Sequence, residues 1–228
     1  MESLDMLANN IANASTSGYK ADREFYSLYA APEAAGVISG PDTLPLIERP
    51  WTDFSQGELR PTGNPLDVAL VGKGFFSVDG TGGPLYTRDG SFRVSAGGQL
   101  VTAEGYAVRG VDGNPIELSS SAPVEISPDG TVVQDGQTAG QIAVVDFADP
   151  AGLSKQGHNY FRPAPELSAA PASAYEVQQG KLENSNASNA EGAIRLVSVM
   201  RQFEMLQKAA ALGSEMNRKA VEEVARVS

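Results

Sequence analysis

Apolar residues recur at helical spacing near the start of the chain. Leu4, Leu7, Ile11 and Ala14 follow one another at steps of three, four and three, which places them on one side of a helix. Small polar residues and a glycine at 15–18 then predict the end of that helix. A helix of about fourteen residues is marginal in water by itself. We therefore expect it to require a partner.

A second and longer helical pattern occupies the C-terminal end. It begins after the possible N-caps at 184–189, and from Val199 onward its steps alternate between four and three. This heptad spacing predicts a coiled-coil seam. An ordinary helix packed on its own domain is the alternative. The core seam residues are Val199, Phe203, Leu206, Ala210, Gly213, Asn217, Ala220 and Val224, with Leu196 before them and Val227 after.

The residue types along this seam favour a contact surface. Ala210, Gly213 and Ala220 are small and allow backbones to approach closely, while Asn217 is a polar interruption that can fix register. Glycine costs about 1 kcal/mol relative to alanine inside a helix. A glycine at 213 is therefore easiest to understand as part of an interface.

The middle of the chain has a strand pattern. Turn-forming Asp-Gly pairs at 79–80, 89–90, 112–113, 129–130 and 135–136, with Gly97-Gly98, separate short β-rich runs. Prolines at 163, 165 and 171 predict a looped exit. The expected strands are 66–71, 74–78, 85–88, 92–95, 99–102, 106–109, 124–126, 131–134 and 141–147.

These patterns predict a mainly β protein. We expect an antiparallel domain, sandwich-like or barrel-like, with N- and C-terminal α-helices that pair as a coiled coil. The four expected parts are an N-terminal helix and turn at 1–28, an irregular arm or linker at 29–57, a β-rich domain at 58–179 and a coiled-coil helix at 180–228.

Composition narrows the classes of function. Of the 228 residues, 41% are hydrophobic and 20% are charged, which is typical of a folded protein. The net charge of −11 argues against nucleic acid as a partner. There is no cysteine, no apolar run of the ~20 residues that a membrane span needs, and no signal-peptide pattern at the start. These features alone indicate a cytoplasmic protein, or one exported without a cleaved signal.

Candidate catalytic residues are few. His158 is the only histidine, and spacing identifies no partner for it. Asp67 and Asp89 could form a carboxylate pair for glycoside hydrolysis, but a strand-edge role and a turn role explain them more simply. Gly72-Lys73-Gly74 lacks the spacing of a phosphate-binding loop. We expect no catalytic residue, no cofactor and no metal.

Several segments together resemble the flagellar rod and hook family. They begin with LANNIANASTSGYK at 7–20 and end with GKLENSN, just before the final helix. The segment RQFEM at 201–205 is most similar to the proximal-rod F subunits of that family, with the distal-rod type as the alternative. The full set of blocks is 7–20, 64–76, 86–92 with 98–102, and 180–186.

The resemblance implies a structural subunit of the flagellar basal body that serves motility. Such subunits are exported unfolded, without a cleaved signal peptide, through the flagellum's own type III export apparatus. They then stack with copies of themselves and with other rod and hook subunits into a rod that crosses the periplasm, without inserting into a membrane. Their terminal helices form the inner tube, which assigns self-assembly to Leu4, Leu7, Ile11 and the seam.

Three alternatives and one departure accompany this reading. The chain could be a distal-rod or hook-type subunit, a β-rich adhesin or carbohydrate-binding module with an oligomerising tail, or a carboxylate hydrolase. The family implies a further helical stretch before the position of Met1, which this sequence does not contain. A misassigned start, a trimmed chain and a true shortening are all open explanations.

Overall fold

The chain forms two compact units in the computed structural model, which describes residues 2–30, 43–119, 122–157 and 159–227. One unit is Asn13–Ala187. The other combines Met1–Ala12 with Ser188–Ser228, so segments from the two ends of the sequence belong to one unit.

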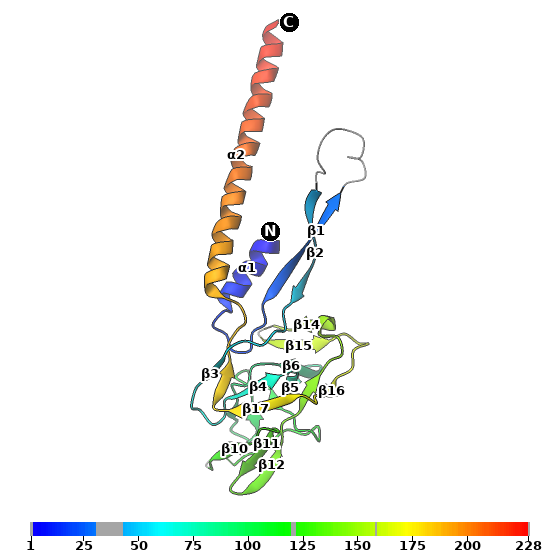
Figure 1. The fold of residues 1–228 in the computed structure, drawn as a ribbon, viewed down its shortest axis with the longest axis vertical. Helices are drawn as coiled ribbons and strands as arrows, with labels where there is room; N and C mark the ends of the chain where they lie inside the picture. Colours follow the sequence, from blue (N-terminus) through cyan, green and yellow to red (C-terminus); the bar gives the residue numbers. More distant parts are fainter. Residues whose placement is uncertain (1, 31–42, 120–121, 158, 228) are drawn as a thin grey trace. The chain divides into compact units, whose positions relative to one another are not determined.

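The unit made from the chain ends consists of two helices in contact, α1 (Glu2–Ala12) and α2 (Asn189–Val227) (Figure 1). The Ser188 hydroxyl accepts a hydrogen bond from the Glu191 amide at 3.3 Å, so Ser188 acts as the N-cap of α2. At 1.5 Å per residue, the 39 residues of α2 extend about 58 Å, whereas the 11 residues of α1 extend about 16 Å. The prediction of a helix at each end is confirmed.

The larger unit begins with a two-stranded antiparallel ribbon. Its strands are β1 (Asp22–Ala30) and β2 (Thr43–Thr52), with Arg23 opposite Trp51 and a register irregularity near Glu24. The sequence predicted an irregular arm at 29–57, and this is wrong for the residues of β2. The prolines of β2 suggested a linker, yet a two-stranded ribbon leaves one edge of each strand without ladder bonds, and proline is tolerated there. Residues 31–42 of the expected arm lie outside the described residues.

The rest of this unit is built from antiparallel strands in four sheets, which confirms the predicted mainly β class. The largest sheet has the order β14-β15-β6-β5-β9-β8-β7, with β13 and β16 joined to it through β5. Its strands are β5 (Phe75–Gly80), β6 (Gly83–Thr87), β7 (Arg93–Val94), β8 (Leu100–Val101), β9 (Ala107–Val108), β13 (Val144–Asp146), β14 (Leu153–Lys155), β15 (Tyr160–Pro163) and β16 (Ala170–Pro171), and the short 3-10 helix η2 (Pro150–Gly152) precedes β14.

Three smaller sheets complete the unit. One has the order β10-β11-β12, and the others pair β17 with β4 and β18 with β3. The last two pairs join strands more than a hundred residues apart, such as Gln179 opposite Val68. These strands are β3 (Leu59–Pro61), β4 (Val68–Gly72), β10 (Val124–Ile126), β11 (Thr131–Gln134), β12 (Gln137–Gln141), β17 (Tyr175–Gln179) and β18 (Lys181–Glu183).

The predicted turns hold in part. Asp135 and Gly136 both have positive φ, of 52° and 72°, in the turn between β11 and β12, as two-residue hairpin turns require. The Asp79-Gly80 pair is not a turn, because both residues belong to β5. The chain reverses after them, where Gly82 has a φ of 83°.

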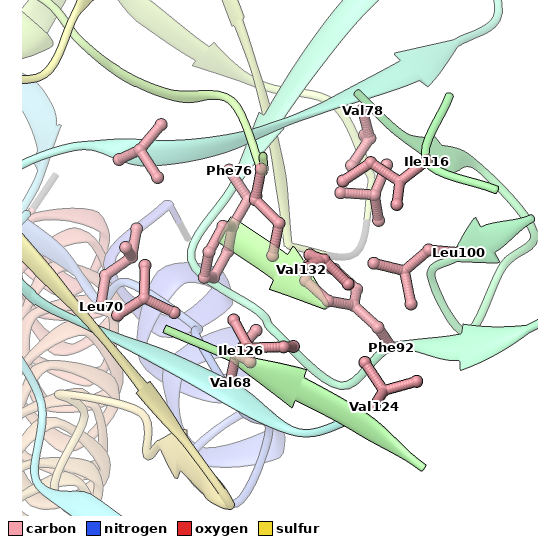
Figure 2. Close-up of a cluster of buried hydrophobic side chains, with 14 of the residues drawn as sticks. Val68, Leu70, Phe76, Val78, Phe92, Leu100, Ile116, Val124, Ile126 and Val132 are labelled. Carbon is pink, nitrogen blue, oxygen red and sulfur yellow. The ribbon is translucent and has the colours of Figure 1, made fainter. Parts of the chain in front are cut away.

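The core divides into two hydrophobic clusters on either side of β5. Successive strand residues point to opposite faces, so Phe75 and Phe76 enter different clusters. Phe76 is fully buried, and its ring meets Phe92 edge to face at 5.2 Å among aliphatic side chains of several strands (Figure 2). Phe75 packs in the second cluster with Phe147 and Phe161.

Candidate assembly site

The predicted self-assembly residues of α1 are at least partly buried. Leu7 is buried, and Leu4 and Ile11 are half-buried. A Cβ atom on Gly192 of α2 would lie 2.8 Å from Cγ1 of Ile11, which is closer than real Cβ contacts. The absence of a side chain at 192 therefore lets Ile11 pack directly against the α2 backbone.

The predicted seam residues all lie in α2, but the structure describes few of their side chains. Val199 is half-buried. Gly213 is exposed, and a Cβ atom there would have no neighbour within 4 Å. The side chains of Phe203, Leu206, Ala210, Asn217, Ala220 and Val224 lie outside what the structure describes, so their role in self-assembly stays a prediction.

The sequence reading missed a set of exposed apolar side chains on α2. Ile194, Met205, Leu212 and Met216 are 71%, 62%, 61% and 71% exposed. The spacing of these four residues places them on one side of the helix and can be recognised in the sequence. It was missed because the heptad pattern of the seam is more regular.

Within the larger unit, the segment that follows α1 lies against the segment that precedes α2. The Gly18 amide donates to the Glu183 carbonyl at 2.7 Å, and the Asn186 side-chain oxygen accepts from the Ala21 amide at 2.7 Å. We call this region the junction and define it as residues 18–21, 55–57, 88 and 183–186. It brings together residues of three of the sequence blocks, from the two ends and the middle of the chain.

A buried ion network lies at the centre of the junction. Lys20 Nζ is 2.6 Å from Oε1 of Glu183, and Arg88 Nη1 is 3.4 Å from Oε2 of the same carboxylate. The side chains of Lys20 and Glu183 are completely buried, and that of Arg88 is 5% exposed. Lys20 also donates to the Ser55 carbonyl at 2.7 Å, and the Gly57 amide donates to Glu183 Oε1 at 2.8 Å.

Burial has the largest effect on the pKa values of the two buried cations, Lys20 and Arg88. Desolvation lowers the pKa of the Lys20 ammonium, and the Glu183 charge and its hydrogen bond oppose that shift. Burial likewise lowers the pKa of the Arg88 guanidinium, again against Glu183. One carboxylate thus serves two buried cations. Removing one partner from such a group leaves an uncompensated buried charge, which strongly destabilises a protein.

Glycines allow the backbone segments of the junction to meet. Gly18 has a φ of 68°, and a Cβ atom there would lie 2.3 Å from the Asp89 amide nitrogen. A Cβ atom on Gly57 would lie 2.0 Å from the Asn184 carbonyl oxygen. No side chain fits at either position without movement of backbone. The chain crossings therefore require glycine.

A second group of contacts holds the segment before β1. Lys155 Nζ donates to the Lys20 carbonyl at 2.7 Å, pairs with Asp22 at 2.8 Å and lies 4.5 Å from the centre of the Tyr19 ring. Burial, with the nearby Asp22 charge, raises the pKa of the Tyr19 hydroxyl to about 12. The Asn159 amide donates to the Ser17 carbonyl at 2.5 Å. The N-terminal segment is therefore fixed along several consecutive residues.

The candidate carboxylates have structural contacts. Asp89 Oδ1 accepts from the Ser91 amide at 3.0 Å, which is the turn role expected for it. Asp67 accepts from the Asn64 side chain at 2.9 Å. Burial raises the pKa of the Asp89 carboxyl, the Ser91 hydrogen bonds oppose this, and the charges of Glu104 and Asp67 add to it. His158 lies outside the described residues.

In the described part of the chain, no group of three or more His, Cys, Asp or Glu side chains is arranged to hold a metal ion. No helix in those same ranges is long and apolar enough to cross a membrane. The arrangement that the structure does show joins distant segments of backbone and leaves an extended helix with exposed apolar side chains.

The chain matches two protein families, and several individual proteins over most of its length. The family described as flagellar hook protein FlgE/F/G D1 domain matches residues 69–134, and the family described as flagella basal body rod protein matches residues 2–20. The flagellar basal-body rod protein FlgF of Caulobacter vibrioides is 33% identical over 227 residues, covering 99% of this chain and 93% of the relative. FlgG proteins of Agrobacterium fabrum and Borreliella burgdorferi are 32% and 34% identical, each over 93% of this chain and over 90% and 89% of the relatives.

Proposed function

The chain belongs to the family of flagellar basal-body rod proteins, and from this premise we propose that α1 and α2 polymerise it axially while the unit Asn13–Ala187 fixes the segments leading to them. The chain is a structural subunit of the rod and serves motility.

The junction is the observation that carries the proposal. Glu183 lies six residues before Asn189, where α2 begins, and Lys20 lies eight residues after Ala12, where α1 ends. Their 2.6 Å contact inside the protein holds the two connecting segments to each other. A force applied along either helix would therefore be received by the folded unit through both segments, which suits a subunit of a mechanical shaft.

Several finer features belong to the same proposal. We place the chain in the proximal rod, because the FlgF of Caulobacter vibrioides is 33% identical over nearly the whole chain. Its partners are copies of itself and other rod and hook subunits. It reaches the periplasm-spanning rod through the flagellar export apparatus without a cleaved signal peptide. The helices α1 and α2, within the segments 1–28 and 180–228, supply the coiled-coil contacts, and 29–57 and 58–179 form an arm and a β-rich body.

A structural role without catalysis is part of this proposal. Asp67 and Asp89, the carboxylates considered for a hydrolase, are each explained by a local hydrogen bond. The relatives named above are rod proteins by name, which supports neither an adhesin nor a hydrolase. The distal rod is the second candidate position, and the FlgG relatives are the observation that favours it.

Substitution on the predicted seam tests the proposal. Leu206→Asp places a charge in the expected contact, whereas Gln207→Asp places the same charge on an exposed neighbour outside the seam. In cells lacking the chromosomal copy, we expect Leu206→Asp to abolish swimming and to be absent from purified basal bodies, with the β unit still folded. Gln207→Asp should be near wild type. Normal motility of Leu206→Asp would overturn the proposal.

A further inference from the structure

The Asp-Gly pairs of the β unit share a chemical reactivity that is separate from their role in turns. The backbone nitrogen of the glycine can attack Cγ of the aspartic acid before it, because glycine has no side chain to hinder the approach. A C–N bond forms, the C–O bond to the carboxyl hydroxyl breaks, and this hydroxyl leaves as water with the amide proton. The product is a five-membered succinimide ring. The pairs are 79–80, 89–90, 112–113, 129–130 and 135–136.

Water reopens the succinimide ring in one of two ways. Addition at the Cγ carbonyl restores aspartate, whereas addition at the main-chain carbonyl gives isoaspartate, in which the main chain runs through Cβ. The water taken up replaces the water released, so the net reaction is an isomerisation that needs no other reactant. Its rate at each pair depends on whether the carboxyl group and the glycine nitrogen are free to meet.

Two of the pairs are held inside the β unit. Asp79 lies in β5, which is paired on both sides, and its Oδ1 is 3.3 Å from Nε of Arg109. Asp89 Oδ1 accepts from the Ser91 amide at 3.0 Å. The next residue, Gly90, is so close to other backbone that a Cβ atom there would lie 1.9 Å from the carbonyl oxygen of residue 68. The peptide units of these two pairs cannot rotate unless neighbouring backbone moves.

Two further pairs lie in turns whose reacting groups are hydrogen-bonded. Asp112 accepts from the backbone and side-chain amides of Asn114 at 3.1 and 2.9 Å, and Asp129 accepts from the backbone amide and hydroxyl of Thr131 at 3.0 and 2.9 Å. The glycine amide after each aspartate donates to the carbonyl three residues before it, at 2.8 and 2.9 Å. These side-chain bonds lower the pKa of both carboxyls, so the neutral form that releases water is scarcer.

The pair Asp135-Gly136 differs from the other four. Both residues are exposed in the loop between β11 and β12, and a Cβ atom on Gly136 would meet no atom within 4 Å (Figure 1). Within the described ranges, neither the Asp135 carboxylate nor the Gly136 amide forms a hydrogen bond or an ion pair. The electrophile and the nucleophile of the reaction are therefore both unrestrained at this pair.

The turn itself is one peptide rotation away from the reactive geometry. The φ angles of Asp135 and Gly136, 52° and 72°, are those of a type I′ turn. Rotation of the peptide unit between them gives a type II′ turn, which also joins strands through two residues. This rotation takes the ψ angle of Asp135 from about +30° to about −120°. There the Gly136 nitrogen eclipses Cβ and faces Cγ, so the ring can close.

We propose that Asp135-Gly136 is the site at which the folded chain isomerises to isoaspartate, with water as the only co-reactant. The reaction adds one atom to the main chain of the tightest loop of β11 and β12, so the pairing of Gln134 with Gln137 beside it loses its two-residue turn. Because only the β unit takes part, the assignment is independent of how the chain polymerises.

Ageing of the purified full chain tests the assignment. The protein is kept at 37 °C and pH 6 for several weeks, and total isoaspartate is measured by methyl transfer from S-adenosylmethionine with an isoaspartate-specific carboxyl methyltransferase. Electron-transfer fragmentation of peptides then locates the isoaspartate. We expect it to accumulate at Asp135 at least ten times faster than at Asp112 or Asp129, which serve as internal controls in the same molecule.

A variant and a denatured sample separate the effect of the fold from that of local sequence. Asp135→Glu keeps the charge but would have to close a six-membered ring, so it should remove most of the methyl transfer. In urea, where the turn contacts of Asp112 and Asp129 are lost, the three sites should react at rates within about twofold of one another. Equal rates at the three sites in the folded chain, or the same preference for Asp135 in urea, would overturn the assignment.

Discussion

Glu183 has a completely buried carboxylate that makes several contacts. Its carboxylate contacts Lys20, Arg88 and the Gly57 amide, while its own carbonyl accepts from Gly18. Buried ion pairs rarely add stability over apolar packing, but they tolerate few alternative arrangements. The network therefore acts mainly to specify how segments distant in sequence meet.

Neutralising Glu183 should show how much the protein is destabilised when its two buried cations lose the Glu183 charge. Glu183→Gln keeps the shape and an acceptor oxygen but removes the carboxylate charge that Lys20 and Arg88 share, leaving only the weaker influence of Asp53 and Asp146. We expect the free energy of unfolding to fall by about 3–5 kcal/mol. Urea denaturation at pH 7 measures it. Glu176→Gln, an exposed strand residue, is the control and should change stability by less than about 0.5 kcal/mol. A loss below about 1 kcal/mol for Glu183→Gln would contradict the role given to the network.

Two glycines with similar φ angles separate steric overlap from conformational strain. Gly18 and Gly63 have φ of 68° and 74°, but a Cβ atom at 18 would overlap Asp89 backbone, whereas at 63 it meets nothing within 4 Å. Gly63→Ala should cost about 1–2 kcal/mol, the price of the left-handed region alone. Gly18→Ala should cost at least a further 1–3 kcal/mol from overpacking. Equal thermal stability of the two variants would show that the close approach at Gly18 is unimportant.

Asp89 should make stability depend on pH in a direction opposite to most carboxylates. Burial raises its pKa in the folded state, with Glu104 and Asp67 adding to the effect. The folded protein therefore holds this proton more tightly than the unfolded chain. The stabilisation that Asp89 contributes to the folded protein is present at low pH and is lost as pH rises from about 3.9 through the raised pKa. Asp89→Asn should remove that decline. Stability curves for both proteins between pH 4 and 7 check this, and parallel curves would contradict it.

At the scale of elements, sequence periodicity predicted the helices and strands whose formation depends on residues close by in the sequence. The terminal helices and most strands of the β body follow from spacing and turn residues, because each is specified by neighbours in sequence. In this body, strands β3, β12, β14, β15, β16, β17 and β18 were not predicted. β17 and β18 are stabilised by pairing with β4 and β3, which lie more than a hundred residues away.

The candidate site shows the same division between local and distant information. The apolar faces of α1 and α2 could be read from the sequence, since helix geometry converts spacing into a face. Nothing in the spacing of Lys20, Arg88 and Glu183 predicts that they meet. Their position inside the recognised sequence blocks was the available signal, since charged residues within such blocks could have been suspected of pairing with one another.

Gly213 offers a test in which helix stability and assembly change in opposite directions. Alanine at 213 meets no atom of the chain and should stabilise the exposed helix by about 1 kcal/mol. If a second copy occupies that space, the added methyl group should reduce incorporation into basal bodies severalfold. Ser214→Ala is the control and should affect neither greatly. Circular dichroism of the monomer and quantitation of basal bodies give the two measurements. Unchanged incorporation of Gly213→Ala would mean that nothing packs closely there.

At the scale of the whole molecule, charge and apolar surface are distributed between different units. The acidic excess lies in Asn13–Ala187, while the exposed apolar side chains gather on the charge-balanced α2. Soluble copies would thus repel through one unit and attract through the other. This balance favours contacts that are made only when helices are aligned and the acidic units are held apart.

The order of the chain adds a constraint on when the larger unit can fold. Lys20 and Arg88 must be buried with Glu183, and β3 and β4 must pair with β18 and β17, all of which come near the end of that unit. A chain that lacks this last segment has two cations and two strands without partners. The first 180 residues by themselves should therefore remain unfolded.

Two truncations that differ by seven residues test this dependence. A chain ending at Ala187 retains every contact of the junction and should show a cooperative thermal transition of the β unit close to that of the full chain. A chain ending at Gly180 lacks β18 and Glu183, so two buried cations lose their counter-charge, at about 3–5 kcal/mol, together with a strand pair. Since domains of this size have only about 5–15 kcal/mol of stability, we expect it to be largely unfolded at 25 °C by circular dichroism and amide exchange. A cooperative transition at the same temperature in both truncations would show that the unit folds without its final segment, and the junction would then be a consequence of folding and not a condition for it.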